Sequence, residues 1–139
     1  MQQEDMDKLR FGTAGIPLST KPRDTINGIK KVRELSLDAM ELEFVRSIHI
    51  TKEKAPAVHQ VAKEKDIILT CHAPYFINLN SEDKKKFHAS LSYITNSAKI
   101  TSLCGGYSIC FHAGYYQKQD PEKVYHKIKE AIKRIVDEV

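Results

Sequence analysis

The sequence repeats one pattern four times: a short run rich in β-forming residues, then a longer charged segment with apolar residues at helical spacing. The β-rich runs cover residues 9–14, 39–44, 67–72 and 107–112. The predicted helices cover a segment capped by Asp24, residues 55–65, residues 86–104 and a segment that starts at Pro121. Strands that alternate with helices favour right-handed crossovers and a parallel sheet, so the pattern predicts an α/β fold.

Side-chain alternation along these runs indicates which parallel sheet the chain forms. One face is apolar in each run, and we expect it to pack against helices. Its residues are Met40, Leu42 and Phe44, then Ile67, Leu69 and Cys71, then Tyr107, Ile109 and Phe111. The opposite face is polar, with Glu41 and Glu43 on the second run and His72 and His112 ending the third and fourth.

A polar face argues against an open sheet covered by helices on both sides, because both of its faces would be apolar. It suits a barrel, whose inner face turns polar toward the mouth where the chemistry takes place. We therefore predict a (βα)4 half of a TIM-type (βα)8 barrel with parallel strands. It forms a single partial domain over residues 1–139, with residues 1–8 as a flexible N-terminal extension.

Composition narrows the setting of this domain. The chain has 139 residues, about half of the roughly 250 typical of a complete (βα)8 barrel. Three cysteines do not form a disulfide framework, and no apolar stretch is long enough for a membrane span, so we expect a cytoplasmic protein that does not bind membranes. The net charge of +4 permits a polyanionic partner without requiring one.

Two of the six histidines are candidate metal ligands. His72 and His112 each end a predicted strand and begin similar phrases, His72-Ala73-Pro74-Tyr75 and His112-Ala113-Gly114-Tyr115. Because the two strands are neighbours, we expect the imidazoles to lie side by side at the barrel mouth, and paired imidazoles favour zinc or a similar ion. One such histidine alone is more often a buried, hydrogen-bonded core residue. The remaining four, in charged surroundings, are expected at the surface: His49, His59, His88 and His126.

Glu43 points toward the same mouth by strand parity. It is a candidate metal ligand, a candidate partner that orients an imidazole, or a candidate general base. An equally good reading is a salt bridge from Glu43 to Arg10. Cys110 lies two residues below His112, too deep for a metal ligand, and is expected to pack.

Three phrases resemble the endonuclease IV family: Arg10 to Pro17, Thr70 to Leu79, and Cys110 to Gly114. The middle phrase is the most specific, because it is similar to the family's His-x-x-Tyr-x-x-Asn-Leu element. The resemblance implies a zinc-dependent apurinic/apyrimidinic endonuclease with a xylose isomerase-like TIM barrel. Such an enzyme acts in base excision repair of DNA and hydrolyses the phosphodiester at abasic sites, with zinc activating water and stabilising charge on the phosphate.

Carried over residue by residue, the resemblance implies that His72 and His112 are zinc ligands. It implies that Tyr75 and Phe76 enter the DNA at the abasic site, where one missing base lowers the cost of unstacking. Arg46 is the strong cation of the loop after the second strand, which also touches DNA in the family. The other reading of Tyr75 and Phe76 is a hydrophobic cover over the mouth.

The chain lacks part of what this chemistry needs. The family takes further zinc ligands from strands five to eight, and no histidine or carboxylate after His112 stands at a predicted strand end. The full trinuclear zinc cluster cannot come from this chain alone, so we expect little or no nuclease activity from it in isolation. Four strands also leave two open edges, which predicts self-association or pairing with a missing C-terminal half.

Two other functions remain open at this point. A fragment of a sugar isomerase or epimerase of the same superfamily would use a metal and histidine on a hydroxy-ketone. A non-catalytic half barrel would bind nucleic acid or a partner chain.

Overall fold

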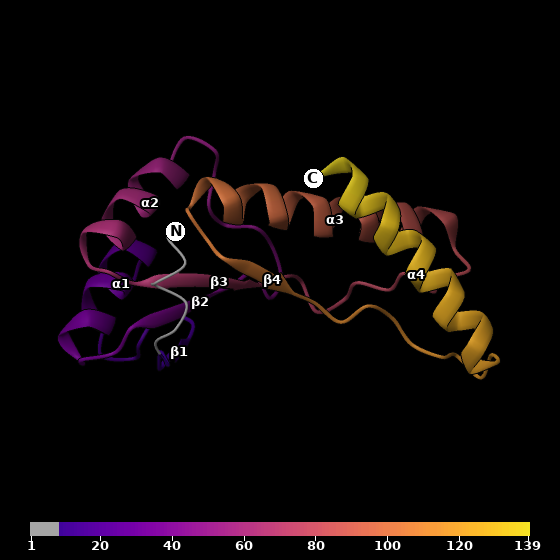
Figure 1. The fold of residues 1–139 in the computed structure, drawn as a ribbon, viewed down its shortest axis with the longest axis horizontal. Helices are drawn as coiled ribbons and strands as arrows, with labels where there is room; N and C mark the ends of the chain where they lie inside the picture. The colour runs from indigo at the N-terminus through magenta and orange to yellow at the C-terminus, as the bar shows by residue number, and fades with distance from the viewer. Residues whose placement is uncertain (1–8) are drawn as a thin grey trace.

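The structure, a computed structural model, describes residues 9–139; the predicted N-terminal extension, residues 1–8, lies outside this range. Strands and helices alternate along the chain as predicted (Figure 1). The strands are β1 (Gly12–Ala14), β2 (Ala39–Glu43), β3 (Ile68–His72) and β4 (Ser108–Cys110). The helices are α1 (Thr25–Glu34), α2 (Ala55–Glu64), α3 (Lys84–Leu103) and α4 (Pro121–Glu138).

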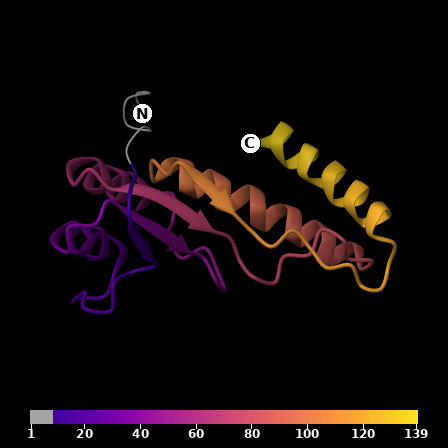
Figure 2. The same cartoon turned by 60° about the horizontal axis from the view of Figure 1, so that its bottom comes forward.

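The four strands form one parallel sheet in the order β1-β2-β3-β4. In Figure 2 the strands lie in front of α1, α2 and α3, and no helix of the described chain crosses in front of them. α4 extends past the sheet and packs against α3. The predicted (βα)4 half barrel is therefore confirmed. None of the described helices combines the length and the apolar character that crossing a membrane requires.

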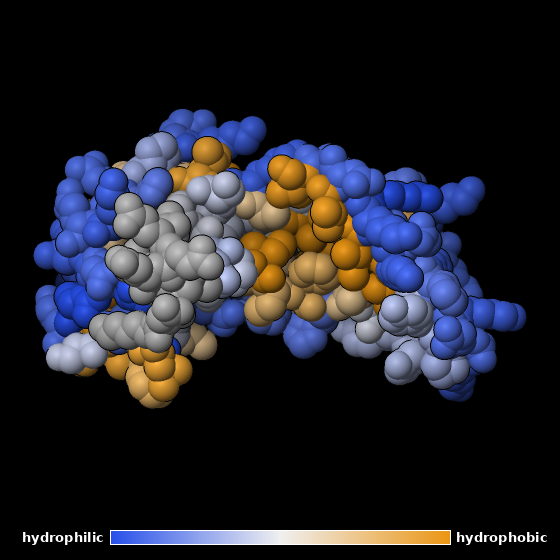
Figure 3. Space-filling view, in the orientation of Figure 1, coloured by the Kyte–Doolittle hydropathy of each residue, from blue (hydrophilic) through white to orange (hydrophobic). Residues whose placement is uncertain are grey.

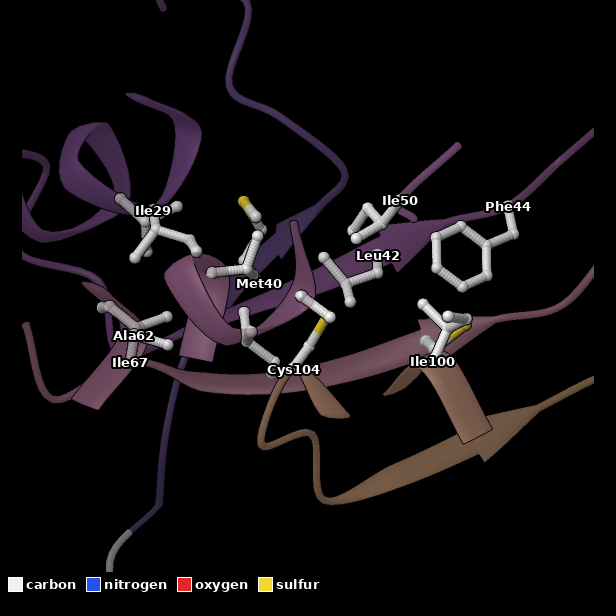
Figure 4. Close-up of a cluster of buried hydrophobic side chains, with 14 residues drawn as sticks. Ile29, Met40, Leu42, Phe44, Ile50, Ala62, Ile67, Ile100 and Cys104 are labelled. Carbon is white, nitrogen blue, oxygen red and sulfur yellow. The ribbon is translucent and has the colours of Figure 1, made fainter. Parts of the chain in front are cut away.

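The main hydrophobic core lies between the sheet and the helices, as strand parity predicts (Figure 4). Met40, Leu42 and Phe44 of β2 and the loop after it are fully or almost fully buried, beside Ile29 of α1. A second cluster joins α3 and α4 to the loop after β3, through Ala73, Ile77, Leu79, Ile94, Ala131 and Ile135. The opposite face of the sheet stays partly exposed at Glu41, Glu43, Thr70 and His72.

Local sequence signals explain where two helices begin. The Asp24 carboxylate accepts a hydrogen bond from the backbone N–H of Asn27, and this N-cap bond starts α1. Asp120 caps α4 in the same way, ahead of Pro121 in the first turn.

The edge strands differ from their predictions. The predicted run 9–14 pairs only over Gly12–Ala14, and the run 107–112 only over Ser108–Cys110. Tyr107 was expected to pack against a helix but is 54% exposed. It precedes β4 at the edge of the sheet, and no further strand of the described chain lies there to cover it.

Candidate functional site

The two histidines singled out in the sequence come together at the carboxyl ends of β3 and β4. The ring centroids of His72 and His112 are 5.2 Å apart, with the ring planes tilted by 49°. His72 ends β3, whereas His112 lies two residues beyond β4. The loop after β4, which carries His112, is held against the loop after β3, because the backbone N–H of Leu79 donates to the carbonyl of Ala113 at 2.8 Å.

A backbone contact fixes the tautomer of His72. Its Nδ1 lies 2.8 Å from the carbonyl oxygen of Ala73, and a carbonyl can only accept, so Nδ1 carries the proton. The lone pair of the neutral ring is then on Nε2. Such a carbonyl contact is the usual way in which proteins orient a metal-binding imidazole.

Glu43 lies opposite His72 in the register of β2 and β3. Burial raises the pKa of Glu43, the neighbouring Glu41 carboxyl raises it further, and His72 opposes the shift. Glu41 in turn accepts a hydrogen bond from the Cys110 thiol at 3.4 Å. The site therefore holds two carboxyl groups close enough for one to favour the neutral form of the other.

The alternative salt bridge from Glu43 to Arg10 is not formed. The Nη1 atom of Arg10 instead lies 3.4 Å from a carboxylate oxygen of Asp66. Arg10 precedes β1 and Asp66 precedes β3, so both stand at the amino ends of their strands, whereas Glu43 stands at a carboxyl end. Because the strands run parallel, Arg10 and Glu43 lie at opposite ends of the sheet.

The donor set fits a metal ion only in part. No three histidine, cysteine or carboxylate side chains between residues 9 and 139 converge closely enough to hold a metal ion together. A catalytic zinc takes three protein ligands and a structural zinc takes four. His72 and His112 supply two imidazoles, fewer protein ligands than either kind of zinc site takes.

Two residues that the sequence did not single out for this site also lie near Glu43. Arg23 and His49 line a hollow of about 260 Å³ together with Glu41 and Glu43. The ring of His49 packs edge-to-face on Phe44, 5.2 Å between centroids. Both residues lie in loops that follow β1 and β2, and no residue pattern in the sequence marks them.

The aromatic loop after β3 lies beside the loop after β2. The backbone N–H of Tyr75 donates to the carbonyl of Val45 at 3.3 Å, which places Tyr75 next to the segment that carries the exposed Arg46. Tyr75 and Phe76 are 51% and 43% exposed. Phe76 also packs edge-to-face on Tyr93 of α3, 4.9 Å between centroids. The two neighbouring loops thus offer partly exposed aromatic rings and the exposed cation of Arg46.

Residues 29–139 match the family described as Xylose isomerase-like TIM barrel. The chain belongs to this family. It is 39% identical over 131 residues to an uncharacterized protein of Methanocaldococcus jannaschii, covering 94% of this chain and 46% of the relative. It is 26% identical over 82 residues to a probable endonuclease 4 of Mycoplasma genitalium, covering 57% of this chain and 28% of that protein. The chain thus spans less than half the length of these curated relatives.

Solved structures of other proteins share the fold. An endonuclease IV from Thermus thermophilus superposes with a TM-score of 0.67 at 17% identity, over 91% of this chain and 47% of that one. A D-psicose 3-epimerase determined in the presence of D-fructose superposes with a TM-score of 0.67 at 20% identity, over 93% of this chain and 48% of the epimerase. At these identities the likeness shows the fold alone. The coverage of about half of each solved chain agrees with a chain that forms four of the eight βα units of a barrel.

Proposed function

We propose that this chain is the endonuclease IV-like half of a zinc-dependent DNA-repair enzyme of the cytoplasm, which hydrolyses the phosphodiester at abasic sites during base excision repair. The observation that carries the proposal is the pair His72 and His112, 5.2 Å apart at the strand ends with Glu43 in register beside them. The sequence similarity to a probable endonuclease 4 supports the choice of substrate.

In this proposal His72 and His112 hold zinc through their imidazoles. His72 presents Nε2 because its Nδ1–H donates to the Ala73 carbonyl. Glu43, whose pKa is raised by burial and by Glu41, accepts or releases a proton beside the pair or completes the ligand set. When bound there, zinc would supply a Lewis acid that activates water and offsets the charge on the phosphate.

The loops after β2 and β3 would contact the DNA. Tyr75 and Phe76 present partly exposed rings that can fill the gap left by a missing base. Arg46, on the adjacent loop, is placed to neutralise a phosphate, since phosphate contacts dominate DNA affinity.

The site needs a second set of βα units. The described sheet ends at β1 and β4, each with one neighbouring strand. Hydrophobic surface runs along the side of α4 that faces the sheet (Figure 3), where Tyr125, Ile128, Ile132 and Val136 line a hollow of about 630 Å³. We propose that a complementary half barrel, from the missing C-terminal half or from a second copy by self-association, covers this surface and adds the remaining zinc ligands.

A second candidate is a sugar epimerase half barrel. Similar structures include a D-psicose 3-epimerase and a D-tagatose 3-epimerase-like protein, the latter with a TM-score of 0.70 at 13% identity. A carboxyl group with a raised pKa, such as Glu43, also suits removal of a proton beside a ketone.

The test combines this chain with the part of the Methanocaldococcus jannaschii relative that it does not span. The mixture, supplied with zinc, is offered an abasic-site duplex and, separately, D-psicose. We expect nicking of the abasic duplex, loss of nicking in His112→Ala, and retention in His88→Ala, a matched control on the exposed side of α3. Conversion of D-psicose without nicking would replace the nuclease proposal with the epimerase.

A further inference from the structure

The two similar phrases that begin at His72 and His112 lie close to each other at two places. The first is the histidine pair, and the second is a hollow that a tyrosine of each phrase lines. Tyr75 of the first phrase and Tyr115 of the second line the same hollow, of about 490 Å³, between the loop after β3 and α3. Phe76, Lys86 and Tyr93 line it as well. Each phrase thus places one histidine in the candidate metal pair and one tyrosine on the wall of what we call the aromatic hollow.

Hydrogen bonds hold the two loops together at this hollow. The side-chain amide of Asn80 donates to the carbonyl of Tyr115 at 2.7 Å. Gly114 permits this approach, because a Cβ there would lie 2.9 Å from Oδ1 of Asn78. The backbone N–H of Asn78 donates to the Ser90 hydroxyl of α3 at 3.0 Å, which ties the loop to the helix. The walls of the hollow are therefore set by internal bonds before any ligand arrives.

The aromatic rings retain free surface inside this framework. Tyr75, Phe76, Tyr93 and Tyr115 are between 36% and 55% exposed. Tyr75 contacts Phe76 and Phe76 contacts Tyr93, both edge-to-face, with centroids 5.7 and 4.9 Å apart. Edge-to-face pairs leave the face of one ring of each pair open, and a flat ligand stacks on such faces.

The charge around the hollow is suited to an anion. Lys86 is exposed in the first turn of α3, after Lys84 and Lys85, and none of the described carboxylates forms an ion pair with its ammonium group. Of the residues that line the hollow, none between positions 9 and 139 is acidic. Aromatic faces beside an unpaired cation are typical of sites that stack a base and neutralise its phosphate.

We propose that the aromatic hollow binds one nucleotide of a single-stranded or flipped-out DNA segment. The base stacks on an open ring face of the hollow, offered by Tyr75, Phe76, Tyr93 or Tyr115, and Lys86 contacts the phosphate. The volume of about 490 Å³ falls in the range of small-molecule pockets. The choice of DNA as ligand rests on the proposed function, whereas the site itself is separate from the histidine pair and needs no metal.

The test uses the 139-residue chain and a metal-free, fluorescently labelled oligothymidylate with one 5-iododeoxyuridine. We expect photo-crosslinks, mapped by peptide mass spectrometry, on Phe76, Tyr93 or Tyr115. Fluorescence anisotropy should show at least about fivefold weaker binding for Tyr93→Ala and for Tyr115→Ala, since stacking of one base contributes an effect of this size or more. Tyr115→Ala, in a loop, keeps the test valid if Tyr93→Ala fails to fold.

Two lysines of one helix turn provide the matched control. Lys86→Ala should weaken binding several-fold and reduce the salt dependence by about one counterion, while Lys84→Ala, with the same loss of charge, changes affinity less than about twofold. Crosslinks elsewhere, or equal effects of the two lysine variants, would overturn the aromatic hollow as a nucleotide site. Failure of the proposed function looks different: abasic DNA stays intact in the reconstituted barrel while crosslinks still form in the hollow.

Discussion

Glu43 and His72 face each other because β2 and β3 pair in parallel register, and strand parity turns both side chains to the same face. His112 joins them from the loop beyond β4. At this scale strand parity predicts the placement of Glu43 and His72, while His112 reaches the same end of the sheet from beyond β4. The sequence does not predict that Arg23 and His49 lie near Glu43, because their positions depend on how the loops after β1 and β2 fold against each other.

The histidine pair gives a direct prediction for metal binding. His72→Ala and His112→Ala should each lower the zinc affinity of the chain by about tenfold or more, because each removes one of two imidazole ligands. His88→Ala should leave the affinity unchanged. Competition with a chromophoric chelator measures all three, and an unaltered affinity in His112→Ala would exclude this pair as the zinc site.

The N-cap of α1 gives a prediction for stability. Asp24→Ala should lower the free energy of unfolding by about 1 kcal/mol, because the backbone N–H of Asn27 loses its acceptor. The same bond holds the pKa of Asp24 below its ordinary value of 3.8. The ionised Asp24 carboxylate therefore contributes fully to the free energy of unfolding above about pH 4. This contribution is lost as the pH falls through the pKa of Asp24 in the folded chain, which is the lower of its two pKa values.

Urea denaturation from about pH 3 to about pH 7 measures this effect. Asp24→Asn is the control, because it keeps a capping side chain without the charge. It should reduce the loss of stability on acidification relative to the natural chain. An identical pH profile in the two proteins would contradict the assignment of that loss to Asp24.

Among the elements, helices and central strands follow the predicted ranges closely, whereas the edge strands are shorter. Helical periodicity and capping residues are local, so Asp24 and Pro121 mark their helices in the sequence. The length of a strand depends on pairing with a neighbour. Cys110 pairs with His72, the last residue of β3, so the ladder stops there although the β-rich run continues to His112.

The close contact between β1 and β2 depends on Gly12. A Cβ at this position would lie 2.0 Å from the backbone carbonyl oxygen of Ala39. Gly12→Ala should therefore lower the free energy of unfolding by about 1–3 kcal/mol, since backbone cannot move aside without separating the strands. Urea denaturation checks this.

Gly28→Ala is the matched control for that substitution. Its Cβ would meet the Ile16 side chain at 3.1 Å, and the gain in helix propensity offsets the contact. We expect its stability to stay within about 1 kcal/mol of the natural chain. Equal stability of Gly12→Ala and the natural chain would show that β1 does not approach β2 as described.

At the scale of the whole molecule, the four described strands leave the inner face of the sheet open, and the thiol of Cys110 on this face is exposed. Cys110 is exposed on the open face, while Cys71 and Cys104 are buried. Burial raises the pKa of Cys71 to about 12 and that of Cys104 to about 11. The sequence predicts that Cys110 packs as a small buried thiol, and this prediction is wrong, because Cys110 is exposed.

Thiol labelling turns this difference into a prediction. At neutral pH the folded chain should expose one thiol, Cys110, to Ellman's reagent, and three after denaturation. Addition of a complementary half barrel should slow the labelling of Cys110 and leave the total of three unchanged. Labelling of Cys110 at the same rate in the presence of the complement would mean that the open face stays uncovered.

In the proposed function, this chain carries half of a nuclease site at His72 and His112. The rate of zinc-dependent nicking of an abasic-site duplex decides this proposal. It is measured with and without the part of the Methanocaldococcus jannaschii relative that this chain does not span. We expect no measurable nicking by the chain alone, and nicking by the mixture that His72→Ala abolishes. Robust zinc-dependent nicking by the isolated 139-residue chain, or nicking by the mixture that persists in His72→Ala, would contradict the proposal.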